Sequence, residues 1–185
     1  MVKDALREAE DRMKGALKSL EESLSTVRTG RASPTLVEKL PVEYYGTPTP
    51  LMQLATISAP EARLLTIKPF DATSIKTIEK AILASDLGLN PSNDGKLIRL
   101  AIPPLTEERR RDLIKVVHHR LEEARVAVRN VRRDVHNDLR DFEKEKLISE
   151  DELKRGEDGL QKLTDKYVEL IEAVGKKKEE EIKQI

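Results

Sequence analysis

Apolar residues recur every three or four positions in three long segments of the chain. This spacing places them on one face of an α-helix and is typical of helices that pack along a seam, as in coiled coils. The first segment carries Leu6, Met13, Leu17, Leu20, Leu24 and Val27, the second Leu113, Val117, Leu121, Ala124, Val128, Val131, Val135, Leu139 and Phe142, and the third Leu153, Leu160, Leu163, Tyr167, Leu170 and Val174. The pattern predicts three long helices with aliphatic seams.

A very short connection separates the second and third segments. Residues 149–152 read SEDE, a capping box that starts a new helix immediately after Leu147 and Ile148. A turn this short makes the two flanking helices antiparallel. Aromatic residues make up only 3% of the chain, so aliphatic packing must supply the core. We expect a three-helix bundle whose second helix, from about residue 106 to 147, is about 60 Å long.

The pattern changes between the first and second helices. Residues 30–105 contain all nine prolines and four of the eight glycines. Runs of β-forming residues predict strands at 37–45, 51–57, 64–69 and 97–102, with a turn at 46–50 and a helix at 74–87. The fold class is therefore α+β: an elongated antiparallel three-helix bundle, residues 1–29 and 106–185, with a small inserted β/α/β domain, residues 30–105, on a two-strand hinge.

Two short segments join the insert to the bundle, and they are the candidate hinge. A pair of short connections would let the insert swing while limiting other motions. The Pro-Pro pair could equally end a strand and stiffen a fixed elbow, and the sequence leaves both interpretations open. The hinge residues are Gly30, Arg31, Ala32 and Ser33 on one segment, and Pro103, Pro104, Leu105 and Thr106 on the other.

Charge is balanced over the whole chain but not along it. The totals are 34 basic and 34 acidic residues. Residues 109–133 hold nine basic and three acidic side chains, whereas residues 134–185 hold eleven basic and sixteen acidic ones. Such a molecule would approach a polyanion with one surface only. The absence of Cys, of a signal peptide and of an apolar membrane span indicates a cytoplasmic protein without membrane association.

Three arginines in the second helix, Arg129, Arg132 and Arg133, have no Asp or Glu three or four positions away. Arg125, by contrast, has Glu122 at that spacing. Like charges at these spacings destabilise a helix, while planar guanidinium groups suit phosphate oxygens. The cluster therefore indicates a site for an external anion, although the arginines could instead bond acids on the neighbouring helix.

A helical projection extends this cluster into a basic stripe. Its members lie within roughly 60° of arc, centred about 90° from the apolar seam, which predicts that the stripe faces solvent. They are Arg111, His118, Arg125, Arg129, Arg132 and His136.

Catalytic and metal-binding patterns are missing from the sequence. There is no phosphate-binding Gly-Lys-Ser/Thr loop, no nucleophile elbow and no acid/base pair, so we expect no enzyme activity. His118 and His119 diverge on the helix and do not form a metal set with His136. Of Tyr44 and Tyr45, neighbours on a strand, one should be core and the other surface, which disfavours a base-stacking pair.

Five motifs resemble those of the ribosome recycling factor family. They are RTGRASP at 28–34, VEYYGTPTP at 42–50, SDLGLNP at 85–91, PPLTEERR at 103–110 and VAVRNVRRD at 126–134. The resemblance runs essentially end to end and in the same motif order. It implies a three-helix-bundle domain joined by a mobile hinge to a β/α/β domain, with a size and outline similar to those of a transfer RNA.

The resemblance also implies a function in translation. Such a factor acts with elongation factor G and GTP to split the post-termination ribosome into subunits, which releases messenger RNA and deacylated transfer RNA. Its partners would be the 70S ribosome, mainly large-subunit ribosomal RNA, and elongation factor G, with initiation factor 3 keeping the subunits apart. The GTP belongs to elongation factor G, so no cofactor and no metal are expected of this chain, which would act as a monomer.

By the same resemblance, particular residues contact ribosomal RNA. Arg129, Arg132 and Arg133 match family arginines that contact the large subunit, and Arg28 and Arg31 match the family motif beside the hinge. The alternative function, of another class, is a coiled-coil adaptor that presents a protein-binding insert.

One departure from the family pattern concerns packing. Gly156 and Gly159 stand where family members usually carry larger residues, and Gly156 falls on a seam position. Either the helices approach closely there or the turn end of the bundle is soft.

Overall fold

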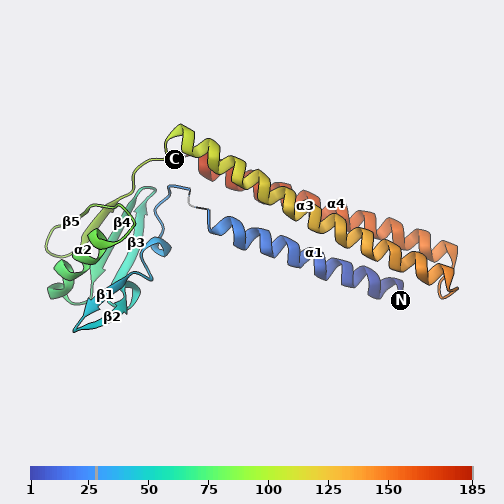
Figure 1. Cartoon of the computed structure of the whole chain (residues 1–185), viewed down its shortest axis with the longest axis horizontal. Helices are drawn as coiled ribbons and strands as arrows, with labels where there is room; N and C mark the ends of the chain where they lie inside the picture. Colours follow the sequence, from blue (N-terminus) through green and yellow to red (C-terminus); the bar gives the residue numbers. More distant parts are fainter. Residues whose placement is uncertain (28, 185) are drawn as a thin grey trace. The chain divides into compact units, whose positions relative to one another are not determined.

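The computed structural model describes residues 1–27 and 29–184, and the chain divides into two compact units (Figure 1). Unit 1 combines Met1–Arg28 with Glu107–Gln184, and unit 2 is Thr29–Thr106. Unit 2 is therefore an insertion into the chain of unit 1. Both junctions lie within one residue of the boundaries that the sequence predicts.

Over its described residues, unit 1 is a bundle of α1 (Val2–Ser25), α3 (Glu107–Lys144) and α4 (Glu150–Lys183), each packed against the other two. The 38 residues of α3 make it about 57 Å long. Ser149 caps α4 as predicted: its Oγ accepts from the Glu152 amide at 3.2 Å, and the Glu152 carboxylate accepts from the Ser149 amide at 2.8 Å. The predicted antiparallel helical bundle is confirmed.

The apolar seam of α3 is buried as the sequence predicts. Only Phe142 of the predicted positions is half-buried. The α1 seam is also recovered, with Met13, Leu20 and Leu24 buried. The buried residues of α3 are Leu113, Val117, Leu121, Ala124, Val128, Val131, Val135 and Leu139.

The buried line of α4 differs from the predicted one. Leu170 is exposed, and Leu153, Leu163 and Val174 are only half-buried. The seam includes small residues that a search for large apolar side chains passes over. The buried positions of α4 are Gly156, Leu160, Thr164, Tyr167, Ile171, Gly175 and Ile182.

Two of these glycines let helices approach closely. A Cβ on Gly175 would lie 2.3 Å from Leu121 Cδ1 and 3.1 Å from its Cγ. A Cβ on Gly156 would meet Leu139 Cδ1 and Val2 Cγ1, both at 3.1 Å. The close-approach interpretation of Gly156 is therefore correct, and Gly175 is a tighter contact of the same kind that the sequence analysis missed.

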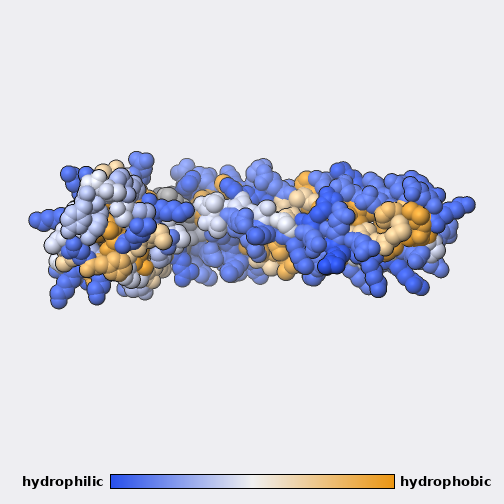
Figure 2. Space-filling view, turned by 90° about the horizontal axis from the view of Figure 1, so that it is seen from below, coloured by the Kyte–Doolittle hydropathy of each residue, from blue (hydrophilic) through white to orange (hydrophobic). Residues whose placement is uncertain are grey.

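On the face of unit 1 seen in Figure 2, charged and polar side chains cover most of the surface, and an apolar area lies toward the α3–α4 turn. Near that turn, Met1 and Leu147, each about half exposed, line a shallow hollow together with Val2 and Ile148. Among the described residues, no helix combines the length and apolar character that crossing a membrane requires.

Unit 2 is built on a four-stranded antiparallel sheet in the order β3-β4-β6-β5. Its strands are β3 (Ala55–Glu61), β4 (Leu64–Pro69), β5 (Pro91–Asn93) and β6 (Ile98–Ala101). Alternate residues of β4 and β6 are fully buried, as period-two patterning requires. The single α-helix described in this unit, α2 (Ile75–Ala84), adds Ile75, Ile78 and Ile82 to the same core.

A separate hairpin of β1 (Pro41–Tyr44) and β2 (Thr47–Pro50) corrects one expectation. The predicted turn at 46–50 is wrong beyond Gly46, because residues 47–50 pair with β1. The turn itself is Tyr45-Gly46, both with positive φ, at 49° and 78°. Two prolines in β2 disfavour a strand in sequence patterns, yet a two-stranded ribbon has open edges where the missing N–H groups are not needed.

Other boundaries in unit 2 are also narrower than predicted. Residues 51–53 form a 3-10 turn rather than the start of a strand, and the strand expected from residue 37 begins at Pro41, after a 3-10 turn at Pro34–Leu36. A third 3-10 turn, Ala72–Ser74, precedes α2. The strand at 91–93 was not predicted, because Pro91 opens it and it spans three residues.

A matched pair of glycine substitutions tests the close helix approach. Gly175→Ala should lower the free energy of unfolding by about 1–2 kcal/mol, because overpacking against buried Leu121 outweighs the helix propensity gained. Gly15→Ala on α1, where a Cβ meets nothing within 4 Å, should raise it by up to about 1 kcal/mol. Urea unfolding of both variants measures the difference. Equal stabilisation by the two substitutions would contradict the packing described.

Candidate functional site

Arg129 lies on an exposed face of α3 but is not without a counter-ion. Its guanidinium donates to the Glu122 carboxylate, and the arginine side chain remains 56% exposed. The prediction that Arg129 has no acidic neighbour was wrong because it considered only spacings of three and four. Seven residues make two helical turns, which returns Glu122 to the same face within reach of a long side chain.

Arg132 and Arg133 match the prediction more closely. Arg132 Nη1 donates to the Gln161 side-chain oxygen at 3.1 Å, and Arg133 Nη2 donates to the Asn130 side-chain oxygen at 3.2 Å. Both arginines are exposed. Within the described part of the chain, neither forms an ion pair with a carboxylate, so their charges are available to an external anion.

Arg111 of the predicted basic stripe is exposed and pairs with Glu107 on α3 itself, whereas three other members of the stripe bond a neighbouring helix. His118 bonds Glu179, Arg125 bonds Glu172, and His136 Nε2 lies 2.9 Å from Glu157. These partners all belong to α4. The stripe therefore follows the groove between α3 and α4, because the seam residues bring the two helices close enough for their flanking charges to meet.

Arg125 is the most strongly held cation of this stripe. Its side chain is 28% exposed, and it binds Glu172 at 2.6 Å and Glu122 at 3.0 Å. The Glu172 hydrogen bond is the main cause that raises the pKa of Arg125 above its ordinary value. Arg125 therefore stabilises the contact between α3 and α4, whereas Arg132, seven residues further along, is left without an acid.

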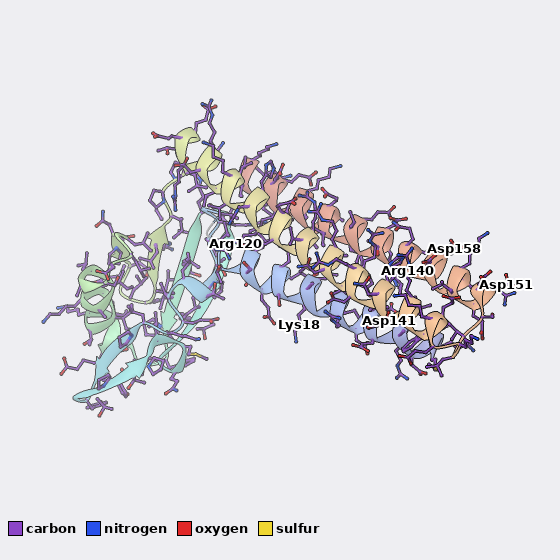
Figure 3. The ribbon with its side chains drawn as sticks, turned by 45° about the vertical axis from the view of Figure 1, so that its right-hand side comes forward. Lys18, Arg120, Arg140, Asp141, Asp151 and Asp158 are labelled. Atoms are coloured by element: carbon purple, nitrogen blue, oxygen red, sulfur yellow. The ribbon has the colours of Figure 1, made fainter. Side chains whose placement is uncertain are left out.

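Charged side chains of two helices gather near the α3–α4 turn. Asp141 of α3 and Asp151 and Asp158 of α4 lie toward that turn in Figure 3, together with Arg140. Arg120, labelled in the same view, lies where α3 passes the end of α1 and donates to Ser23.

The predicted hinge residues fall into two groups. Ala32 is buried in the core of unit 2, and its amide donates to the Ala62 carbonyl at 2.7 Å. On the other segment, the Ile102 amide donates to the Arg63 carbonyl at 2.8 Å. Ala32 is therefore a fixed part of unit 2 rather than part of a hinge.

Of the remaining hinge candidates, Gly30 and Arg31 precede the Ala32 anchor, and Pro103 to Thr106 follow Ile102. Ser33 lies beyond Ala32, where it leads into the 3-10 turn at Pro34–Leu36 of unit 2. Gly30 has a φ of 76°, and a Cβ there would lie 2.8 Å from Leu105 Cγ, so the two segments are in contact. Arg31 is exposed. Arg28, the other arginine of the predicted RNA site, lies outside the described residues.

The other candidates of the sequence carry no ligand site. Among the described residues, no group of three or more His, Asp or Glu side chains could hold a metal ion. Tyr45 is 86% exposed, whereas Tyr44 is half-buried against it at a ring separation of 4.5 Å, edge to face. One tyrosine thus faces inward and the other outward, as predicted.

Two residues that shape this site were missed by sequence reasoning. Glu122 would have been found by extending the search for partners to seven residues. Gln161 would have needed the register between α3 and α4, which the apolar pattern of α4 did not give correctly. Both residues decide how much of the arginine charge is compensated within the protein.

The described residues thus combine a three-helix bundle, an inserted α/β unit and two exposed arginines on α3 that pair with no carboxylate among them. The family model described as "Ribosome recycling factor" matches residues 20–182. This chain belongs to the ribosome recycling factor family, a family of translation factors.

Relatives match over the full length of both units. The ribosome-recycling factor of Carboxydothermus hydrogenoformans is 57% identical over 182 residues, 98% of each chain, and that of Roseiflexus castenholzii is 57% identical over 185 residues, 100% of each. A solution structure of the ribosome recycling factor is 46% identical, with a TM-score of 0.72 over 100% of this chain and 98% of that one.

A second similar structure comes from a larger assembly. It belongs to models for the T. thermophilus ribosome recycling factor and the E. coli elongation factor G bound to the E. coli post-termination complex. Its chain is 47% identical, with a TM-score of 0.62 over 98% of both chains.

The Glu122 ion pairs can be tested by titration. Hydrogen bonds from Arg125 and then Arg129 hold the pKa of Glu122 below its ordinary value. Arg129→Gln should raise that pKa part of the way back, because Arg125 remains, and Arg133→Gln should leave it unchanged. Carbon-detected NMR titration of the Glu122 carboxyl measures both.

The sign of the linked stability follows from the direction of the shift. A depressed carboxyl pKa stabilises the folded protein above the ordinary pKa, and this contribution disappears as the pH falls through the folded-state pKa. An Arg129→Gln variant in which Glu122 titrates as in the wild type would show that the two side chains do not meet in solution.

Proposed function

We propose that this chain acts with elongation factor G to split the post-termination ribosome into its subunits, releasing messenger RNA and deacylated transfer RNA. The observation that carries the proposal is likeness over the full chain, both units included, to ribosome recycling factors. One such factor is named together with elongation factor G on a post-termination complex. GTP is hydrolysed by elongation factor G, so this chain needs no cofactor of its own.

In this proposal the arginines of α3 bind phosphates of large-subunit ribosomal RNA. Arg132 and Arg133 contribute most, because their charges are exposed and are not compensated by a carboxylate. Arg129 contributes after exchanging Glu122 for a phosphate oxygen. Arg28 and Arg31, which flank the start of unit 2 in the sequence, also bind RNA.

Unit 2 moves relative to the bundle during splitting, through residues 29–31 and 103–106. Support for this comes from the anchoring of Ala32 and Ile102 in unit 2, which confines any swing to the few residues outside those anchors. Energy transfer between one dye on each unit, followed through a round of recycling, measures the motion. A constant transfer efficiency would rule it out.

The factor works as a cytoplasmic monomer, and initiation factor 3 keeps the separated subunits apart. In this proposal the chain catalyses no covalent step, and GTP hydrolysis by the partner GTPase supplies the energy for splitting.

Polysome breakdown tests the function directly. Purified chain, elongation factor G and GTP should together convert post-termination polysomes to subunits in the presence of initiation factor 3. Omission of the chain, of elongation factor G or of GTP should each abolish the conversion, read by sucrose-gradient profiles. Full activity without elongation factor G, or none with all components, would sink the proposal.

Arg132→Glu tests the RNA contact. The substitution should weaken large-subunit binding at least tenfold, since it removes a charge-assisted hydrogen bond and adds repulsion. The melting temperature should stay near that of the wild type, because the Arg132 side chain is exposed and bonds only a neutral amide among the described residues. Arg7→Glu, an exposed arginine on α1, makes the same change in net charge and should bind normally.

A further inference from the structure

Two of the charged pairs between α3 and α4 share one register, from which the His136–Glu157 pair is offset by four residues. His118 pairs with Glu179, and Arg125 pairs with Glu172. Seven residues forward on α3 thus correspond to seven residues back on α4, as antiparallel helices with heptad-spaced contacts require. One further step of seven places Arg132 opposite Asp165, and an ion pair between them would complete the series.

The structure instead inserts a neutral side chain between those two charges. Arg132 Nη1 donates to the Gln161 side-chain oxygen at 3.1 Å, and the Gln161 side-chain nitrogen donates to Asp165 Oδ1 at 2.9 Å. Gln161 and Asp165 are one turn apart on α4, so the amide reaches both. In the part of the chain that the structure describes, Asp165 forms no ion pair.

We infer that Gln161 is a positioning residue that keeps Arg132 charged and available for ribosomal RNA. The inference rests on the proposed function of Arg132. An amide oxygen accepts one hydrogen bond and so fixes the direction of the guanidinium without neutralising it. The other N–H groups of the guanidinium remain free for the bidentate contact that phosphate oxygens favour.

The same side chain also engages Asp165, the acid that the register places opposite Arg132. The Asp165 carboxylate is engaged by the Gln161 amide, which holds it in place one turn further along α4. Arg125 shows the result where no such amide intervenes: two carboxylates hold its guanidinium, and it serves the packing of α3 against α4. Arg125 and Arg132 occupy equivalent positions seven residues apart on α3. The Gln161 contact is the reason why Arg125 serves the packing while Arg132 stays available for binding.

Gln161→Glu converts the site of Arg132 into a site like that of Arg125. The new carboxylate lies within hydrogen-bonding distance of the guanidinium and competes with phosphate for it. An exposed ion pair of this kind should weaken large-subunit binding about two- to fivefold. The slope of the logarithm of affinity against the logarithm of salt concentration should also decrease by about 0.7–0.9, the value for one lost phosphate contact. The melting temperature should not fall.

Two controls separate capture of Arg132 from a general charge effect. Gln53→Glu in unit 2 makes the same chemical change at an exposed site and should bind as the wild type does. Gln161→Glu combined with Asp165→Asn restores the wild-type net charge yet keeps the carboxylate beside Arg132. This double variant should bind as weakly as Gln161→Glu. Recovery of wild-type affinity in the double variant would overturn the inference.

Arg132→Gln distinguishes failure of the inference from failure of the proposed function. If Arg132→Gln binds the large subunit like the wild type, Arg132 does not contact RNA and both ideas are wrong. If it weakens binding while Gln161→Glu does not, the role of Gln161 is refuted and the RNA contact stands. The inference requires that Gln161→Glu has no further effect on affinity in the Arg132→Gln background.

Discussion

The close packing of α4 against α3 is the constraint on which the surface chemistry depends. With few aromatic residues, the bundle is filled by aliphatic side chains, and Gly175 and Gly156 remove the volume that would keep the helices apart. Close helices bring the flanking charges of α4 within reach of α3. The same packing that stabilises the bundle therefore decides which basic side chains are compensated inside the protein and which remain available to a partner.

As a result, the arginines within nine residues of α3 are of three kinds. Arg125 is held by two carboxylates and is largely committed to the fold. Arg129 has one exposed carboxylate partner, which water and salt screen, so exchange for an RNA phosphate costs little. Among the described residues, Arg132 and Arg133 bond only amide oxygens. A sequence of similar residues thus forms a graded surface, because the arginines differ in how many carboxylates of α3 and α4 they meet.

The sequence predicts those features that depend on large apolar residues and on local spacing. The α3 seam, the Ser149 capping box and the two-unit organisation follow from such patterns. The α4 seam does not, because Gly156, Thr164 and Gly175 are buried for their small size rather than their hydrophobicity. The β1–β2 hairpin is not predicted, because its prolines disfavour a strand in sequence patterns but are accommodated on a two-stranded ribbon. To predict the Arg129–Glu122 pair, partners two helical turns away must be considered. To predict the contact between Arg132 and Gln161, the register between α3 and α4 must be known.

A few backbone contacts likewise fix where the two connecting segments leave unit 2. The Ala32 and Ile102 amides bind the carbonyls of Ala62 and Arg63, two adjacent residues in the turn between β3 and β4. Both connections therefore leave unit 2 at one place, whatever its orientation. Under the proposed function, a force that elongation factor G applied to unit 2 would be carried to the bundle along these two connections. Phosphate contacts of Arg132 and Arg133, whose charges no carboxylate among the described residues compensates, would then resist that force and pass it to the large subunit.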